Sequence, residues 1–352
     1  MIGPRVVAPP RTDGWEFVRN VVFNTIYQSG GIDPFQLEND IQRVWGYTVN
    51  GRWVHGLTAT SMASVLRDGV DTTTEDTRIF EIEHVDTGEG VELSRTITRP
   101  VGVWASTAQY QYPEATPHPD KQWLGSDLTI RVDTRGRIRD GKPSKSPYAT
   151  ETVIDAVGRD LAQQVVGVLQ TTLEFDAVDV LFSGVPGVYT VIVSDLHVKH
   201  LDTENRDLVG DLLTDVVDVD VDVDVGTVGV DATTEVESWS INTLTERENW
   251  IRAPQTPHSA TGLLSTFVSD LDTFDPFESA VSRYRDIPEL PETIPVKYPS
   301  TTVEETVSVG SHTCTVIPGE REWAPIEPAI YAVSLGVAEP LVTNDLSNFT
   351  QI

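Results

Sequence analysis

The 352-residue sequence contains very little cysteine and lysine. Its only cysteine, Cys314, excludes an internal disulfide, and with five lysines most of the 25 basic side chains are arginines. No stretch approaches the roughly 20 apolar residues that a membrane-spanning helix needs. Residues 1–10 also lack the charged segment and apolar run of a secretion signal. We therefore expect neither membrane association nor secretion.

Acidic residues dominate the charge. Asp and Glu number 54 against 25 Lys and Arg, which gives a formal net charge of −29. Such a chain repels a nucleic-acid backbone and an anionic membrane, so neither is expected as a partner. A large net charge also strains a compact state by self-repulsion, and concentrated salt screens that repulsion because the Debye length is about 3 Å at 1 M. We therefore predict a halophilic protein from a haloarchaeal host; the alternative is an acidic mesophilic protein with a metal-loaded or basic partner.

The pattern of the sequence changes twice along the chain. Residues 1–75 have the spacing of short helices with one hairpin, residues 76–225 combine strands with a long helix, and residues 226–352 are β-rich, extended and rich in proline. We therefore predict three parts: a helical N-terminal region, an α+β core and a C-terminal extension. The predicted fold class is α+β, with a mixed or antiparallel sheet packed on one long amphipathic helix.

Three local patterns predict particular elements. Asn50-Gly51 is typical of the two-residue turn of a hairpin, here over residues 47–54. Apolar residues recur every four positions over residues 153–169, behind a Ser146-Pro147 start, which predicts a long helix. Four prolines within residues 286–300 predict that this segment forms no regular element.

The motifs in the sequence predict no catalytic, cofactor or metal site. Residues 136–143 approach a phosphate-binding loop, but Pro143 stands where Mg²⁺ needs a hydroxyl and removes a backbone N–H. Residues 218–224 place Asp at every second position, which favours a strand with one acidic face over a calcium loop and leaves a bound ion open. His197 and His200 would lie on opposite faces of a strand, so they could share a metal only if the strand ended between them. Neither a Gly-x-Ser-x-Gly nor a His-Glu-x-x-His motif occurs.

Four patterns follow one another in the middle of the chain. They are a strand behind a proline (PVGVW, 100–104), a second strand (LGSDLTIRVD, 124–133), the helix at 151–169 with IDAV at 154–157 and LA at 161–162, and a closing strand at 213–225. In this order they resemble the tail terminator, or tail completion, proteins of long-tailed viruses. That resemblance implies a small α/β subunit, without enzymatic activity, that forms a hexameric ring at the head-proximal end of the tail tube.

From this resemblance we expect a non-enzymatic structural subunit in the tail or neck of a haloarchaeal tailed virus, assembled in the host cytoplasm. The expected partners are further copies of the chain in a ring, and other virion proteins such as the tail tube and the head–tail adaptor. No cofactor is expected. Because aromatic residues concentrate in interface cores, the expected interface residues are Trp104, Tyr110, Tyr112 and Trp123.

Two alternatives remain open. One is a baseplate or receptor-binding subunit of a virion, in which the acidic strand and the loops face outward. The other is a halophilic hydrolase in which the fold brings His197 or His84 to carboxylates, although the sequence shows no catalytic constellation.

Overall fold

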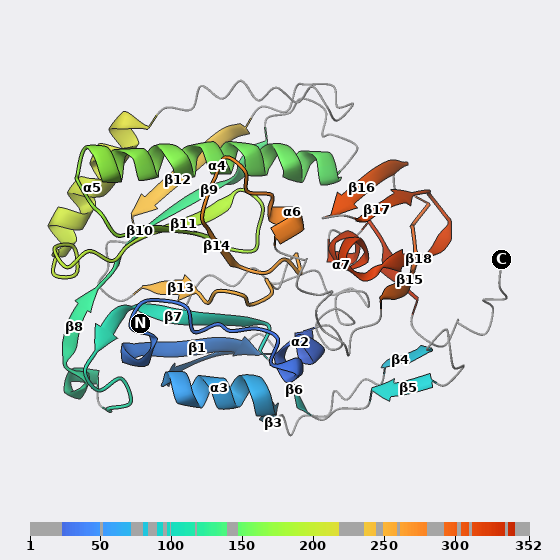
Figure 1. Ribbon diagram of the computed structural model, residues 1–352, viewed down its shortest axis with the longest axis horizontal. Coiled ribbons are helices and arrows are strands. Elements are labelled where there is room, and N and C mark those ends of the chain that lie inside the picture. The colour runs from blue at the N-terminus through green and yellow to red at the C-terminus, as the bar shows by residue number, and fades with distance from the viewer. Residues whose placement is uncertain are drawn as a thin grey trace.

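The computed structural model describes residues 23–49, 52–71, 80–83, 90–93, 97–98, 100–116, 118–138, 147–217, 236–243, 249–258, 261–279, 292–300, 304–309, 312–334 and 337–341. Two five-stranded sheets form its centre, and every strand pair in them is antiparallel. Figure 1 shows one sheet beneath α4 and the other above α3. The predicted α+β class with an antiparallel sheet is confirmed.

The first sheet carries the predicted hairpin. Its strands, in order, are β13 (Trp250–Arg252), β7 (Gly102–Tyr110), β1 (Arg43–Val49) and β2 (Arg52–Leu57), and β8 (Trp123–Ser126) also pairs with β7. Thr48 lies opposite Trp53 in the hairpin. The helix α3 (Ala59–Asp68) begins at Thr58, whose hydroxyl accepts the Ser61 N–H, and packs Met62 against this sheet. The short helix α2 (Asn24–Ser29) packs against α3.

The second sheet packs on the long helix. Its strands, in order, are β12 (Val236–Thr243), β9 (Leu128–Ile138), β11 (Val188–Val193), β10 (Val178–Phe182) and β14 (Thr266–Val268). The helix α4 (Pro147–Thr171) contacts β9, β10 and β11, as its apolar spacing predicts, and buries Leu161 and Val165 completely. A further helix, α5 (Thr203–Val216), lies against β12 and α4.

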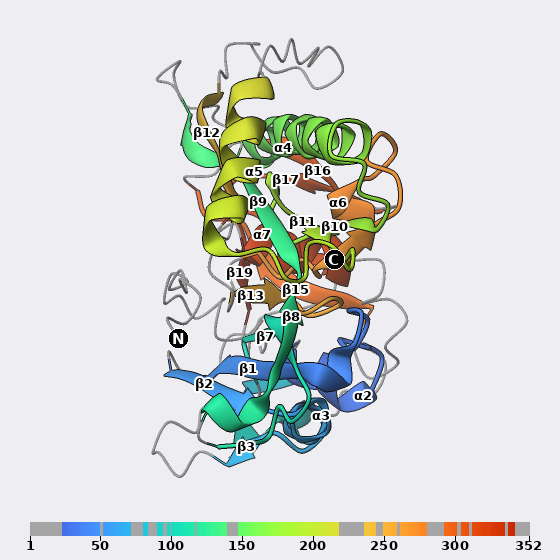
Figure 2. The same cartoon turned by 90° about the vertical axis from the view of Figure 1, so that its left-hand side faces the viewer.

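One stretch of backbone passes from the first sheet to the second. β8 ends at Ser126, β9 begins at Leu128, and only Asp127 lies between them. Figure 2 shows the two strands as one ascending path from the lower sheet to the upper one. The buried apolar core is likewise continuous, from Phe23 in the first part of the chain to Ala338 near its end.

A third, smaller sheet corrects one prediction. It has the order β18 (Arg321–Pro325), β15 (Thr293–Lys297) and β19 (Glu339–Pro340), and lies near the hairpin β16 (Glu305–Val309) and β17 (His312–Val316) and the helices α6 (Pro276–Ser279) and α7 (Ile326–Ser334). The prediction that residues 286–300 form no regular element is therefore wrong. A proline can lie inside β15 because it lacks only its own N–H. The Pro295 carbonyl still accepts the Leu341 N–H, and β19 pairs with the next two residues, Val296 and Lys297.

The remaining described elements are short. They are β3 (Val70–Asp71) paired with β6 (Ile97–Thr98), β4 (Phe80–Glu83) paired with β5 (Gly90–Leu93), and the 3₁₀ turns η2 (Asp40–Gln42) and η3 (His118–Lys121). In the part of the chain that the structure describes, no helix has both the length and the apolar character to cross a membrane.

Candidate anion-binding site

Three arginine side chains are buried in the described part of the chain. Arg43 and Arg206 have no exposed surface, and Arg252 keeps 6%. A buried guanidinium is costly unless its charge and its five N–H donors meet partners. The three arginines differ in how many of their donors and how much of their charge have partners. The arginine with the fewest partners marks the candidate site.

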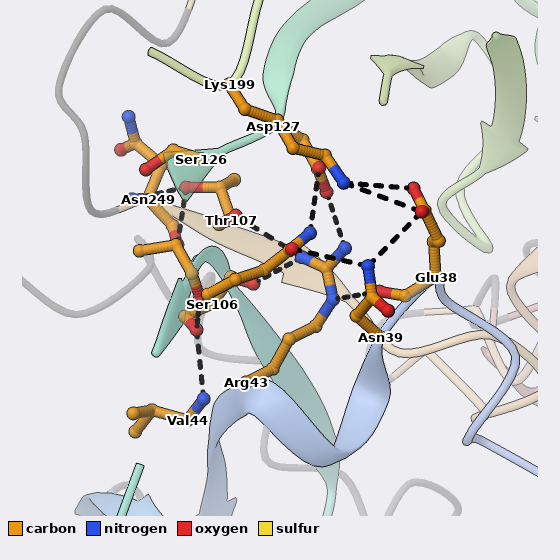
Figure 3. Close-up of polar contacts among 12 residues, drawn as sticks. Glu38, Asn39, Arg43, Val44, Ser106, Thr107, Ser126, Asp127, Lys199 and Asn249 are labelled. Carbon is orange, nitrogen blue, oxygen red and sulfur yellow. Dashed lines mark hydrogen bonds and ion pairs between the residues drawn. The ribbon is translucent and has the colours of Figure 1, made fainter. Parts of the chain in front are cut away.

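Arg43 is fully engaged. It donates to the carbonyl oxygens of Glu38 (Nε, 2.9 Å), Ser106 (Nη1, 2.8 Å) and Thr107 (Nη1, 3.3 Å) and to Asp127 Oδ2 (Nη2, 2.6 Å), as Figure 3 shows. Asp127 Oδ1 accepts a further hydrogen bond from Gln109 Nε2. Burial raises the pKa of the Asp127 carboxyl, and the Arg43 charge opposes that rise. Because Asp127 lies at the passage from β8 to β9, this ion pair fastens the two sheets together.

Arg206 also binds the backbone that connects β8 to β9. Its guanidinium donates to the carbonyl oxygens of Leu201, Asp127, Ser126 and Val198. Arg206 belongs to α5, so that helix is also anchored to the residues that connect the sheets. Both of these arginines therefore have a structural role that accounts for their burial.

Arg252 is not engaged in this way. Its Nη2 donates to the Pro257 carbonyl, and its guanidinium carbon lies 4.9 Å from the ring centre of Trp104. Its Nε is buried without a hydrogen-bond partner, and no carboxylate among the described residues forms an ion pair with it. Burial lowers the pKa of Arg252 to about 10, so the side chain stays charged at neutral pH. It is therefore a buried cation that meets no compensating anion among the described residues.

The strand register explains how Arg252 reaches this position. Arg252 lies opposite Trp104 across the β13–β7 pair, so both side chains are on one face of the first sheet. Gly102 precedes Trp104 by two residues on that face and leaves room for the guanidinium: a Cβ there would lie 3.0 Å from Arg252 Nη1 and would overlap the Trp104 ring. Thr48 lies directly opposite Gly102 on β1.

Aromatic rings surround the arginine on the same face. Trp53 meets Trp104 edge to face at 5.4 Å and meets Trp250 at 4.9 Å, measured between ring centres. The Trp53 ring lies over Gly46 as the Trp104 ring lies over Gly102. The three indoles are partly exposed, and the ring of Trp104 lies directly against the guanidinium.

Two hydroxyl groups share the environment of Arg252. Thr48 Oγ1 and Tyr27 Oη are buried, and neither has a hydrogen-bond partner among the described residues. Burial raises the pKa of the Tyr27 hydroxyl, and the Arg252 charge opposes the rise, so the two groups interact electrostatically. Because this pKa is raised, Tyr27 stays protonated and is a donor. Arg252 and Thr48 thus lie on one face of the sheet, and Tyr27 on α2 interacts with the arginine charge. A cation with two hydroxyl groups suits an anion.

The predicted interface residues lie in different surroundings. Trp104 stacks on Arg252. Tyr110 is 1% exposed and meets His118, whereas Tyr112 is 43% exposed and the partly exposed Trp123 contacts the His200 ring. Their role in an interface stays a prediction.

The histidines and acidic residues of the described ranges form no metal cluster. No group of three or more His, Cys, Asp and Glu residues there could hold a metal ion. His197 is exposed, and the acidic repeat 218–224, His84 and most of residues 136–143 lie outside the described residues. The hydrolase alternative therefore gains no site from the structure.

The sequence patterns did not indicate Arg252, Thr48 or Tyr27 as site residues. One signal was available: Arg252 interrupts the short apolar run Trp250-Ile251-Arg252-Ala253. An arginine within a buried strand needs a partner. Its partners could not be identified, however, because Trp104 and Thr48 are far away in the sequence.

No family model matches the chain, and no curated protein does. The polymerase domain of ligase D from Mycobacterium tuberculosis, solved in complex with DNA, matches the structure with a TM-score of 0.39 and 11% identity, over 78% of this chain and 90% of that chain. A likeness at this level assigns neither a family nor an activity. The prediction of a virion tail, neck or baseplate subunit finds no support in these comparisons and is withdrawn.

Proposed function

We propose that the protein is a binding protein without enzymatic activity, and that it binds an anionic ligand at Arg252. The observation that supports this is the buried guanidinium, whose Nε has no hydrogen-bond partner and which forms no ion pair with a carboxylate of the described residues. Burying an isolated charge costs several kcal/mol, whereas Arg43 in the same sheet meets its full set of partners. An anion at Arg252 would supply the missing charge and the missing acceptor together.

The chemistry around Arg252 favours binding over catalysis. The groups that contact it or interact with its charge are an indole ring, a backbone carbonyl and two hydroxyls, and burial raises the pKa of the Tyr27 hydroxyl, so none of these groups is an activated nucleophile. Arginine stays charged and presents parallel N–H donors to oxyanions, which is why it recurs at carboxylate and phosphate sites. The site therefore provides charge and donors for a resting ligand.

The test is a titration of the full-length protein with inorganic phosphate, acetate and bromide, followed by tryptophan fluorescence because Trp104 lies on the guanidinium. We expect saturable binding of at least one anion, loss of that binding in Arg252→Met, and partial retention in Arg252→Lys. The matched control is Arg67→Met, since Arg67 is an exposed arginine paired with Asp68. Equal anion binding by Arg252→Met and the wild type would overturn the proposal.

A further inference from the structure

Two further buried donors accompany Arg252, namely Thr48 on β1 and Tyr27 on α2. Arg252 Nε, Thr48 Oγ1 and Tyr27 Oη all lack a hydrogen-bond partner among the described residues, and their side chains are 6%, 1% and 3% exposed. Thr48 pairs with Gly102 across β1 and β7, and a Cβ at Gly102 would lie 3.0 Å from Arg252 Nη1, so Thr48 and Arg252 lie on the same part of one sheet face. The Arg252 charge also acts on the Tyr27 hydroxyl. Buried donors without an acceptor are uncommon in folded proteins, and a charged one beside a buried hydroxyl indicates a missing acceptor.

We infer that these three residues form a closed site for one monovalent inorganic anion of the halide class, an inference that rests on the proposed anion binding at Arg252. The donors have almost no exposed surface, so the occupant is small. One guanidinium contributes one positive charge, and a single negative charge neutralises it. A phosphate dianion would leave an excess charge in the same buried place, at a high cost in desolvation.

The composition of the chain agrees with a halide. A net charge of −29 strains the compact state by self-repulsion, which salt screens. A halide present at molar concentration occupies even a weak site, and binding to the folded state alone raises the folding constant by the factor 1 + [X]/Kd. Salt would then stabilise the fold in two ways, by screening at the surface and by filling this site.

The two contributions can be separated by changing the anion at constant ionic strength. The full-length protein is unfolded with urea in 2 M sodium gluconate, whose anion is too large for a closed site, and in mixtures in which sodium bromide or sodium chloride replaces the gluconate. We expect the folding constant of the wild type to rise with bromide and chloride along a saturation curve. For Arg252→Met we expect no dependence on the halide, although the general dependence on ionic strength persists.

Two conservative variants test the hydroxyl donors. Tyr27→Phe and Thr48→Val keep the shape of each side chain and remove one donor, and we expect each to weaken halide binding roughly tenfold, as the loss of a hydrogen bond to a charged group does. Thr107→Val is the matched control, because Thr107 belongs to the same sheet and its hydroxyl bonds to the backbone of Asn249. We expect its halide affinity to equal that of the wild type.

The anomalous signal of bromide in a crystal grown from sodium bromide locates the ion directly. A peak within hydrogen-bonding distance of Arg252 Nε supports the inference. A water molecule at that position, with no halide dependence in solution, overturns it. Should phosphate or acetate bind through Arg252 while halides do not, the halide inference fails and the proposed function stands; if no anion binds, both fail.

Discussion

The carboxylate of Asp127 lies 2.6 Å from Nη2 of Arg43, and the two side chains are 0% and 1% exposed. This ion pair joins β1 of the first sheet to the single residue between β8 and β9. The ion pair therefore links the two sheets, because Asp127 is the single residue between a strand of the first sheet and a strand of the second.

Removal of one partner of this pair should be strongly destabilising. Arg43→Met leaves the Asp127 carboxylate buried without its cation, and we expect a loss of about 3–5 kcal/mol in the free energy of unfolding. The double variant Arg43→Met with Asp127→Asn also removes the unpaired carboxylate charge and should recover part of that loss. Urea unfolding of the three proteins in the same salt measures both effects. A single variant as stable as the wild type would show that the pair does not hold the sheets.

The buried carboxyl of Asp155 should give the fold a distinctive dependence on pH. Asp155 Oδ1 accepts hydrogen bonds from the Gly187 N–H and the Tyr189 hydroxyl, and Oδ2 accepts one from Arg159 Nε. Burial raises its pKa from 3.8 to about 6 despite these partners. The folded protein therefore holds this proton in a pH range where the unfolded chain has released it.

The sign follows from proton linkage. Between pH 4 and pH 6 the folded state binds more protons at Asp155 than the unfolded state does, so this residue's contribution to stability falls as the pH rises and levels off above pH 6. Two pKa units correspond to up to about 3 kcal/mol. Asp155→Asn keeps the acceptor for Gly187 and Tyr189 and does not titrate. We expect the difference in unfolding free energy between wild type and variant to change with this slope, and a constant difference would contradict the raised pKa.

The sequence predicts those helices and turns that depend on residues close together in the chain. The helix α4 was found because its apolar residues recur with helical spacing, and the hairpin because Asn50-Gly51 favours one turn type. The assembly of the sheets could not be predicted, because it depends on distant pairings such as that of Trp250–Arg252 with Trp104–Ser106. Pro295 misled the prediction because a proline excludes only its own N–H from a ladder, and its neighbours still pair.

The candidate site illustrates a different limit. The arginine in Trp250-Ile251-Arg252-Ala253 is visible in the sequence. Its importance comes from the lack of a carboxylate partner among the described residues, which the sequence does not reveal. Arg43 is equally buried and has a carboxylate beside it. Nothing in the sequence near either arginine separates the two cases, since Asp127 is distant from Arg43 and Trp104 is distant from Arg252.

A pair of glycines should distinguish the site from the aromatic face around it. In Gly102→Ala the new Cβ overlaps the Trp104 ring and lies 3.0 Å from Arg252 Nη1, whereas in Gly46→Ala it overlaps the Trp53 ring. Both changes overpack the face and should cost about 1–3 kcal/mol. Only Gly102→Ala should also displace the guanidinium and weaken anion binding. Fluorescence titration of both variants measures this, and an equal loss of affinity would assign the effect to the aromatic packing as a whole.

The sharpest contrast is between two arginines changed to the same residue. In the absence of a bound anion, Arg252→Met removes a buried charge that has no opposite charge, and replaces it with a flexible apolar side chain against Trp104. We therefore expect the unfolding free energy in gluconate to stay equal or to rise by about 1–2 kcal/mol, as buried charges often cost more than their apolar replacements. Arg43→Met in the same medium loses several kcal/mol. Urea unfolding of the two variants under the same conditions tests this. A comparable loss of stability in both would mean that Arg252, like Arg43, has a structural role. A stable Arg252→Met variant that no longer binds anions would mean that the charge at Arg252 is required for the ligand.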